Sequence, residues 1–407
     1  MRILISLGVM LCLMLTACAE PPEDFSGGLR VDLLLADDPD ADLDRFARAE
    51  SPRPYVFPRD HGAHPAYRSE WWYLTLDLRG DDGIRFGAQF TLFRQALAPP
   101  EDVEEPDSGW RSGQIYMAHL ALTDVRAGQH FGAERFARDH PELAGVRDWP
   151  FAVWLEDWSL SSAGVNAMQL PPVVTVAPAQ GADSAEGADD GAAAAVQMLL
   201  PLLLDAATDE FALSLVIDDG RPLLLQGDRG LSAKGPDQAS HYLSITRLQA
   251  QGEVRIGARR YQVEGLGWLD REWSTSVLGE AHQGWDWFGL HLADGRDLMA
   301  FQLRRDDGAR DEFDAGVLRQ SDGSYRALSK EDFRLEPVGW WRDERGVRWP
   351  VRWRIHLHDS DEVLTAEALV DDQLMRTAFR YWEGLVELRD AEGELAGSGY
   401  LEMTGYR

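Results

Sequence analysis

S-E-W-W-Y-L-T-L-D-L-R-G (69–80) and I-R-F-G-A-Q-F-T-L-F-R (84–94) are the two stretches from which the fold of this chain can be predicted. In each stretch, apolar residues occupy every second position, which is the period of a strand with one buried face. The D-D-G turn signal at 81–83 separates the two stretches. The sequence therefore predicts an antiparallel β-hairpin with one apolar face.

Further strand patterns follow this hairpin along the chain. They occur at 115–123, 151–160, 196–204, 210–217, 222–226 and 240–248, and no comparably long stretch with a helical period competes with them. Residues 172–195 are dominated by Ala, Gly, Asp and Pro. Because such a composition offers little to pack, we expect a surface loop inserted into the first domain.

The second half of the chain repeats the first hairpin in D-W-F-G-L-H-L-A-D-G-R-D-L-M-A-F-Q-L-R (286–304). The matching positions are Glu70 and Asp286, Trp71 and Trp287, Trp72 and Phe288, and Gln89 and Gln302. Such an ordered repeat predicts two all-β domains, at 55–250 and 251–407. Closure of each antiparallel sheet into a barrel would remove its exposed edges.

The composition excludes several classes of protein. With 40 Lys and Arg against 69 Asp and Glu, the net charge is -29, and no run of basic residues suits nucleic acid. The chain contains 44% hydrophobic residues and 15 Trp, which is enough to fill sizeable cores. G-x-S-x-G, P-loop and G-x-G-x-x-G motifs are absent, so neither a nucleotide cofactor nor ordinary serine hydrolase chemistry is expected.

The amino terminus is typical of an exported lipoprotein. Residues 1–17 contain a short positive region followed by an apolar segment, and L-T-A-C at 15–18 resembles a bacterial lipobox. Cleavage before Cys18 and acylation of Cys18 would anchor the chain to a membrane. Residues 18–54 would then form an acidic tether, and Ala19 favours the outer membrane of a Gram-negative cell envelope.

Two sets of polar residues flank or enter the first hairpin. Asp60, His61 and His64 could approach a metal ion if their loop curled, but a third spaced ligand is missing, so we expect hydrogen bonds and no metal. The acids Glu70 and Asp286 share the apolar face of their strands. Each must be paired, most simply with arginine, or kept neutral by a raised pKa at an apolar cavity.

Later strands carry further candidate residues. His119 and His241 lie in A-H-L-A-L-T-D (118–124) and S-H-Y-L-S-I-T-R-L (240–248), where a lone histidine is usually structural. In G-L-G-W-L-D-R-E-W-S-T-S (265–276), Asp270 shares a strand face with Trp268 and Glu272. An aspartate among aromatic rings could stay protonated and donate its proton, whereas the alternative is a domain-joining strand with a structural Arg271–Glu272 ion pair.

These motifs together resemble the AttH-like secreted proteins, which are related to the carotenoid 1,2-hydratases (hydroxyneurosporene synthases). The quoted stretches, F-P-R-D-H-G-A-H-P-A-Y-R-S-E-W-W-Y (57–73) and G-W-D-W-F-G-L (284–290) occur in the family order over about 55–407. The resemblance implies two tandem lipocalin-like barrels, with the catalytic positions at His241 and Asp270. Leu243 and Trp268 replace a Trp and a Tyr of the hydratase pattern.

The sequence thus leads to two functional hypotheses. The first is an envelope lipoprotein that binds an apolar isoprenoid or lipid, as an accessory to the FtsX-type ABC transporter permease that the resemblance implies. The alternative is a hydratase in which Asp270 protonates an isoprenoid double bond and His241 orients or relays the proton. The expected ligand cavity is lined by Trp268, Trp273, Glu70, Trp72, His119 and Asp286.

Overall fold

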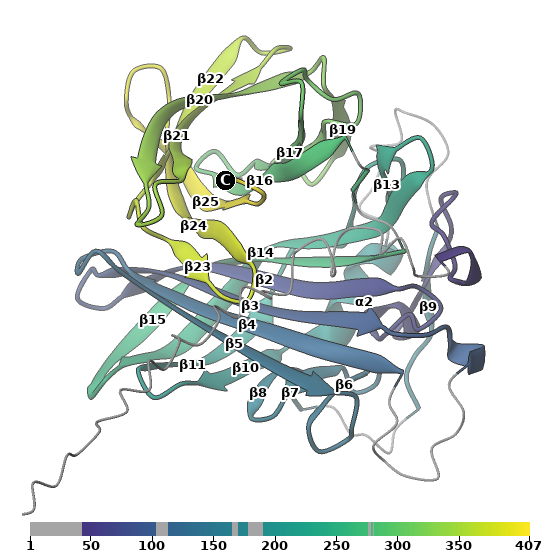
Figure 1. The fold of residues 1–407 in the computed structure, drawn as a ribbon. Coiled ribbons are helices and arrows are strands. Elements are labelled where there is room, and N and C mark those ends of the chain that lie inside the picture. The colour runs from purple at the N-terminus through teal and green to yellow at the C-terminus, as the bar shows by residue number, and fades with distance from the viewer. Residues whose placement is uncertain (1–42, 103–112, 165–169, 178–189, 276–277, 280) are drawn as a thin grey trace, which may run out of the picture.

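The computed structural model describes residues 43–102, 113–164, 170–177, 190–275, 278–279 and 281–407. They form two lipocalin-like antiparallel β domains, as the sequence predicted (Figure 1). Figure 1 shows the first domain in purple to teal and the second, in green to yellow, curved above it. Among the described residues, no helix has both the length and the apolar character needed to cross a membrane.

The first domain is built on one large sheet. In their order across the sheet, its strands are β5 (Gln129–Arg138), β4 (Gln114–Asp124), β3 (Arg85–Ala96), β2 (Ser69–Gly80), β15 (Arg259–Ser274), β14 (Gln238–Ile256), β11 (Phe211–Asp219), β10 (Leu202–Ala207), β8 (Trp158–Ser162), β7 (Ala152–Leu155) and β6 (Ala144–Arg147). Both β12 (Leu224–Leu225) and β13 (Leu231–Gly235) pair with β14. The sheet curls until its two ends are close together. Arg135 of β5 forms an ion pair with Asp157 and stacks over Trp158 near the opposite end of the sheet.

The interior of the first barrel is filled by side chains. Every second residue of β2 and β3 points inward, as the hairpin pattern predicted, and joins one core cluster with Trp72 and Trp273. The Ala-rich end of 172–195 also enters this core, contrary to our expectation of a loop. It forms α2 (Asp190–Leu199), in which Ala195 and Val196 are buried. The expected strand at 196–204 therefore begins only at Leu202.

Short elements complete the first domain. A two-stranded sheet pairs β1 (Tyr55–Phe57) with β9 (Val174–Val176), so a second part of the expected loop is also structured. The remaining elements are the 3-10 helices η1 (Leu43–Arg45), η2 (Arg59–His61) and η3 (Pro100–Asp102). Residues 43–54 contact the domain, since Phe46 is buried. The signal segment, Cys18 and most of the expected tether lie outside the described residues.

The second domain is a curved sheet with its own core. In order, its strands are β19 (Tyr325–Ser329), β18 (Ala315–Arg319), β17 (Asp297–Arg305), β16 (His282–Leu292), β25 (Leu395–Met403), β24 (Arg380–Arg389), β22 (Glu362–Ala368), β21 (Arg348–Leu357) and β20 (Phe333–Arg342), with β23 (Leu374–Arg376) paired to β24. Trp349, Trp353 and Trp382 are fully buried in this core. Much of the tryptophan content is thus structural.

The expected boundary at residue 250 falls inside β14, which belongs entirely to the first sheet. β15 belongs to the same sheet and pairs with β2 over its length from Val263 to Ser274. The change of domain therefore follows Ser274. The strand pattern alone could not show this boundary, because alternation of apolar residues marks a strand without showing to which sheet the strand belongs.

The two repeated hairpins are alike at their acids and differ at their glutamines. An arginine of the second strand binds the acid in each hairpin, with Arg94 on Glu70 and Arg304 on Asp286. Gln302 donates to Asp286 at 2.7 Å, whereas Gln89 contacts Thr91. The expected equivalence of the two glutamines is therefore wrong, although both acids are arginine-paired.

Polar contacts hold the two domains together. Arg85 of the first domain contacts Glu387 of the second at 3.1 Å, and Ser398 donates to Asp77 at 2.6 Å. At another point Asp297 of the second domain accepts a hydrogen bond from Arg221 of the first at 2.9 Å. These contacts surround an apolar cluster to which both domains contribute. The junction therefore has the character of a packed interface.

Candidate active site between the two barrels

A cavity of about 80 Å³ lies at the junction of the two domains. Its walls are largely aromatic, and the aromatic lining residues are Trp71, Tyr73, Phe93, Tyr242, Trp285, Trp287, Phe301, Phe379 and Tyr381. Four carboxylic acids also line it, namely Asp270, Glu272, Glu383 and Glu402. Such a combination of apolar walls and few polar groups is typical of a small-molecule site.

Strand alternation explains why these residues meet outside the first barrel. On β2, Trp72 and Leu74 face the barrel core, so Trp71 and Tyr73 face the second domain. On β15, Asp270 likewise points to the junction, whereas the neighbouring Trp273 side chain joins the barrel core. The second domain supplies the opposite wall from β16, β17, β24 and β25.

Asp270 is buried and accepts three hydrogen bonds. Tyr242 donates to its Oδ2 at 2.7 Å, and its Oδ1 receives bonds from Ser244 at 2.5 Å and Trp268 at 2.7 Å. Burial nevertheless raises the pKa of Asp270 to about 7, because desolvation outweighs the three donors. Tyr242 in turn accepts from Trp287 at 3.0 Å. The hydroxyl of Tyr242 thus connects Asp270 to the cavity wall.

Glu383 and Glu402 form a second acidic group on the other wall. Both carboxylate oxygens of Glu383, and the hydroxyl of Tyr73, are buried and make no well-aligned hydrogen bond among the described residues, although Tyr73 and Tyr381 lie close enough to Glu383 to oppose the rise of its pKa. Burial and the neighbouring Glu402 raise the pKa of Glu383 well above its ordinary value. Burial also raises the pKa of Glu402 to about 7, although Trp285 donates to this group at 2.9 Å. Two interacting carboxyls that share one proton are the expected state near neutral pH.

Glu272 differs from the other three acids because a cation binds it. Lys234, one of only two lysines in the chain, contacts its carboxylate, and Ser240 donates to the same oxygen. The ammonium group also lies 5.6 Å from the ring centre of Trp71. The cavity therefore holds one ion-paired carboxylate beside three acids with raised pKa values. The Arg271–Glu272 ion pair considered from the sequence does not form.

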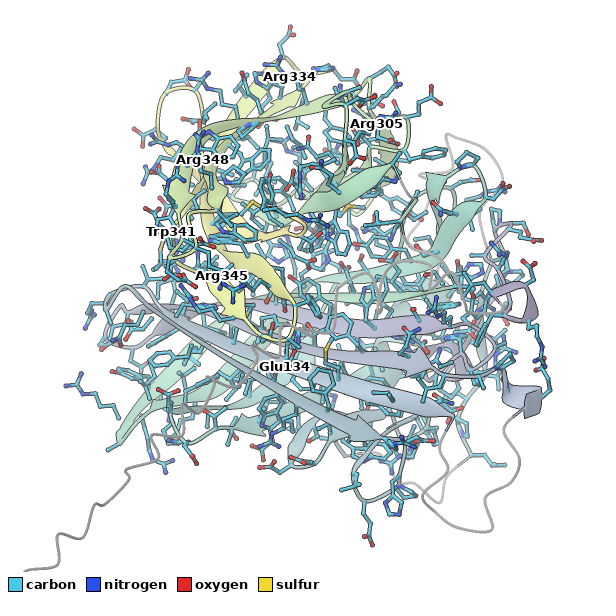
Figure 2. The ribbon with its side chains drawn as sticks, viewed as in Figure 1. Glu134, Arg305, Arg334, Trp341, Arg345 and Arg348 are labelled. Atoms are coloured by element: carbon cyan, nitrogen blue, oxygen red, sulfur yellow. The ribbon has the colours of Figure 1, made fainter. Side chains whose placement is uncertain are left out.

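His119 lies behind the cavity rather than in its lining. Its Nδ1 is 2.7 Å from the hydroxyl of Tyr381, a lining residue, and its Nε2 is 2.9 Å from Glu134. Figure 2 labels Glu134 on the first domain, below the second. Its side chain is 16% exposed, so this chain of contacts runs from the cavity wall to a group that reaches solvent. Burial lowers the pKa of His119, which keeps the ring neutral.

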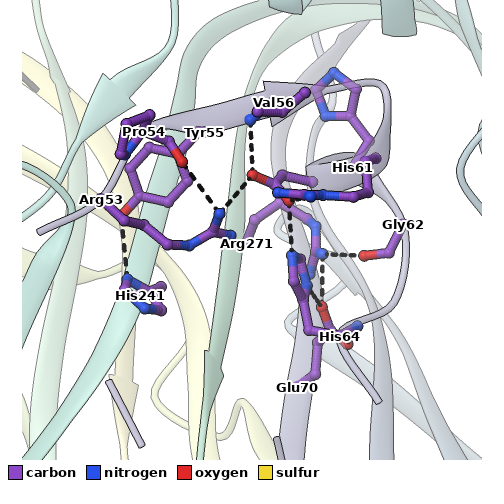
Figure 3. A network of polar contacts seen from close by, with 12 residues as sticks. Arg53, Pro54, Tyr55, Val56, His61, Gly62, His64, Glu70, His241 and Arg271 are labelled. Atoms are coloured by element: carbon purple, nitrogen blue, oxygen red, sulfur yellow. Dashed lines mark hydrogen bonds and ion pairs between the residues drawn. The ribbon is translucent and has the colours of Figure 1, made fainter. Parts of the chain in front are cut away.

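His241 and Asp270, the predicted catalytic pair, lie on opposite faces of the sheet. The Nδ1 atom of His241 is 3.3 Å from the hydroxyl of Tyr55 (Figure 3). The ring of His241 packs against Tyr67 and Trp273 inside the first barrel. Burial and the nearby charge of Arg53 lower the pKa of His241 to about 4. This histidine therefore does not contact the cavity that Asp270 lines.

A bulge in β14 causes the separation. Beside the turn, Ile256 pairs with Arg259, and a regular ladder from there would place Ile245 opposite Asp270, on the face of His241. The register instead shifts between Ile245 and Leu248, so Ser244 is opposite Asp270. One extra residue on one strand exchanges the two faces beyond it.

Glu70 is the centre of a charged network inside the first barrel (Figure 3). Arg94 and Arg271 donate to it at 3.0 and 2.8 Å, and His64 contacts it at 2.7 Å. Although burial opposes ionisation, His64 and the arginines hold the pKa of Glu70 well below its usual range. The arginine-paired interpretation of Glu70 is therefore confirmed, and Glu70 does not line the interdomain cavity.

The remaining predicted residues are also outside the cavity lining. Trp72 is buried in the first barrel, and Trp273 stacks on His64 with ring centres 3.9 Å apart. Asp286 is paired with Arg304, and burial raises its pKa. Trp268 donates to Asp270 and so supports the cavity from behind. Of the predicted site residues, only Asp270 lines the cavity.

The loop with Asp60, His61 and His64 is held by hydrogen bonds. His64 Nε2 lies 3.3 Å from Asp60, and His61 Nε2 lies 2.8 Å from the carbonyl oxygen of Ala195 in α2. Within the described part of the chain, no group of three or more His, Cys, Asp or Glu side chains could hold a metal ion.

Sequence reasoning missed Glu383, Glu402 and Tyr242. Glu383 lies in R-Y-W-E-G-L-V and Glu402 in Y-L-E-M, where each acid shares strand parity with aromatic or apolar residues. The same signal occurs at Glu70 and Asp286, so a buried acid could have been predicted at these two positions as well. Tyr242 adjoins His241 and therefore has the opposite parity.

The fold and the site together define a two-barrel, all-β protein with an aromatic, acid-lined cavity between its domains. The chain belongs to the AttH-like family, whose model matches residues 48–406. The family resemblance read from the motifs is thereby confirmed.

Solved structures share this architecture. An AttH protein from Nitrosomonas europaea is 30% identical, with a TM-score of 0.71, and the match covers 89% of this chain and 100% of that one. Kievitone hydratase from Nectria haematococca has a TM-score of 0.60 at 10% identity, covering 89% and 98% of the two chains, and shares the fold. A comparison with curated proteins finds no match.

Proposed function

We propose that this protein is a hydratase-type enzyme that adds water to a carbon–carbon double bond of an apolar small molecule in the interdomain cavity. The observation that carries this proposal is the placement of two adjoining carboxyls, Glu383 and Glu402, on the wall of an aromatic cavity. The fold shared with kievitone hydratase agrees with this class of reaction. The carotenoid 1,2-hydratase reaction is the finer form of the proposal.

Hydration needs an acid, a site that tolerates a cation, and a base. Glu383, which is buried in the cavity wall, gives its proton to one alkene carbon, so the π electrons form the new C–H bond. The other carbon becomes a carbocation, which the faces of Trp71, Trp285 and Trp287 stabilise. Water then forms the C–O bond, and Glu402 accepts the proton that the water loses.

Proton transfer from Glu402 back to Glu383 restores the starting state. The net reaction is the addition of one water molecule, and no redox cofactor is consumed. Asp270 supplies a second route for the proton, because Tyr242 connects it to the cavity. The sequence-based assignment of Asp270 as the general acid is thus retained as the competing donor. His241 has no direct role in this scheme, since it lies inside the first barrel.

The test begins with the ligand that the protein retains on purification. An organic extract is analysed by mass spectrometry, and both the extracted compound and acyclic carotenoids are then incubated with the protein in oxygen-18 water. We expect one labelled oxygen atom in the product. Retention of an apolar ligand without any label in either sample would support the binding-protein hypothesis and reject the hydratase.

We further propose that Cys18 is acylated and anchors the chain in the outer membrane of a Gram-negative envelope. The L-T-A-C motif supports this proposal. Labelled palmitate should enter the wild-type protein and not Cys18→Ser. A partnership with an FtsX-type ABC transporter permease would appear as co-purification of the two proteins from detergent extracts. Absence of the permease from the purified sample would count against the accessory role.

A further inference from the structure

The β20–β21 hairpin presents an arginine-rich surface on the second domain. The outward positions of its strands and its turn carry Arg334, Arg342, Arg345, Arg348, Arg352 and Arg354, which we call the arginine face. Figure 2 labels three of them, Arg334, Arg348 and Arg345, along the outer side of the second domain. These arginines are separated in the sequence, so they do not form a run of basic residues. Strand alternation brings them to one face.

Few acids neutralise the arginine face. Glu336 binds Arg334 and His356, and Glu367 binds Arg352. Among the described residues, the side chains of Arg342, Arg345, Arg348 and Arg354 form no ion pair with an acid.

The two acids of the hairpin turn are neutralised from elsewhere. Asp343 is buried and binds Arg380 at 2.8 Å. Glu344 binds Arg376 at 2.9 Å and Arg380 at 2.7 Å. Arginines of strands β23 and β24 therefore neutralise these two acids, and the arginine face keeps an excess of positive charge.

Aromatic and apolar side chains are exposed among these arginines. Trp340 is 43% exposed and Val338 is 36% exposed on β20. The guanidinium of Arg348 lies 4.7 Å from the ring centre of Trp340. Tryptophan beside cationic side chains is the composition that favours the boundary between lipid headgroups and acyl chains.

We propose that the arginine face docks the protein on an anionic phospholipid surface. The chain as a whole carries a net charge of -29, so most of its surface is repelled by lipid phosphates. The arginine face is complementary to them, and the guanidinium fork suits phosphate oxygens. Trp340 would enter the headgroup layer. Docking would orient the second domain toward the membrane, independently of the proposed hydratase activity.

The experiment uses protein that lacks residues 1–18, so that no acyl anchor contributes, and that retains every described residue. Co-sedimentation is measured with vesicles of phosphatidylglycerol and phosphatidylethanolamine, and with vesicles of phosphatidylcholine. We expect binding to the anionic vesicles only, weakened by salt. The triple variant Arg342→Gln, Arg348→Gln, Arg354→Gln should lose about 100-fold in partitioning, as three surface arginines imply.

A matched control removes three exposed arginines of the first domain, Arg79→Gln, Arg138→Gln and Arg259→Gln. This variant has the same net charge as the first and should bind like the wild type. Trp340→Ala should weaken binding several-fold and remove a fluorescence change on vesicle addition. Equal losses in both triple variants, or equal affinity of the wild type for phosphatidylcholine, would overturn the proposal. Tighter binding to duplex DNA than to anionic vesicles would also overturn it.

Discussion

At the scale of single residues, Glu383 is the group on which the proposed chemistry depends. Its carboxyl is buried, makes no well-aligned hydrogen bond among the described residues, and faces the cavity. A carboxylic acid kept neutral at this position can act as a proton donor. Asp270 has the competing claim, but its oxygens already accept bonds from Tyr242, Ser244 and Trp268.

Replacement Glu383→Gln should remove at least about 100-fold of the turnover while the fold is retained. Because the pKa of Glu383 is raised, its favourable contribution to stability is present below the unfolded pKa and is lost as the pH rises. The free energy of unfolding at pH 7 should therefore stay equal or increase. Turnover and urea unfolding are the measurements. Glu392→Gln, an exposed glutamate in the turn that follows the same strand, is the control and should keep full turnover.

A comparison with Asp270→Asn decides between the two donors. This variant should lose less activity than Glu383→Gln, because it removes a partner of Tyr242 rather than the donor. The reverse order would transfer the role of general acid to Asp270.

The pH dependence of the reaction follows from the same pair. Burial raises the pKa of Glu402 to about 7, so its base form becomes more populated as the pH rises through that value, while Glu383 still holds its proton. We expect kcat/KM to rise through about pH 7 and to fall where the pair loses its second proton. Glu402→Gln should abolish the rising limb. A wild-type profile that is flat from about pH 5 to 9 would contradict this assignment.

At the scale of elements, the strand alternation of 69–94 predicted the β2–β3 hairpin and favoured the pairing of Glu70 with arginine. The period of two carries that information directly. It could not predict that His241 and Asp270 separate, because a bulge between Ile245 and Leu248 has no composition signal of its own. The bulge contains Arg247, whose backbone φ is 52°, a left-handed conformation that a sequence does not reveal for arginine.

Helix α2 shows the second kind of failure. Its sequence, D-G-A-A-A-A-V-Q-M-L, begins inside the low-complexity stretch for which the composition predicts a surface loop. The helix depends on tertiary packing, because Ala195, Val196 and Leu199 are buried in the barrel core. Small alanine side chains let the helix approach the strands closely. The same composition therefore suits a loop or a packed helix, and only the surrounding barrel decides.

Leu199→Ala tests whether α2 is an integral part of the core. This side chain is 1% exposed, so the substitution should lower the free energy of unfolding by about 2–5 kcal/mol. Gln197→Ala, on the exposed side of the same helix, should change it by less than about 0.5 kcal/mol. Chemical denaturation provides the measurement. Equal effects in the two variants would mean that α2 lies outside the cooperative core.

At the scale of the whole molecule, the site exists only because the two barrels are held together. The first domain supplies Asp270 and Glu272 and the second supplies Glu383 and Glu402, so each domain alone carries half of the acids. Asp297 is a buried point of this junction, contacting Arg221 at 2.9 Å and Arg247 at 2.8 Å. Arg247 lies in the bulge that separates His241 from Asp270, so the same bulge also brings the Arg247 side chain into contact with the second domain.

Asp297→Ala should loosen this junction without touching the cavity. Removing one partner of a buried ion pair leaves Arg221 and Arg247 uncompensated, which costs about 3–5 kcal/mol. Although burial opposes ionisation, His291 and Arg247 hold the pKa of Asp297 below its usual value. Its contribution to stability is therefore present above the unfolded pKa and is lost as the pH falls through the folded value.

The measurements are calorimetric unfolding and turnover across the acid range. Asp297→Ala should unfold at a lower temperature, lose activity through misplacement of the two cavity walls, and lack part of the wild-type decline in stability below about pH 4. The control is Asp294→Asn, an exposed acid that pairs with Arg296 in the neighbouring turn. It should match the wild type in unfolding temperature at neutral pH and in turnover. If Asp297→Ala kept full activity, the cavity walls would be aligned without this contact, and the packed aromatic cluster alone would hold the site together.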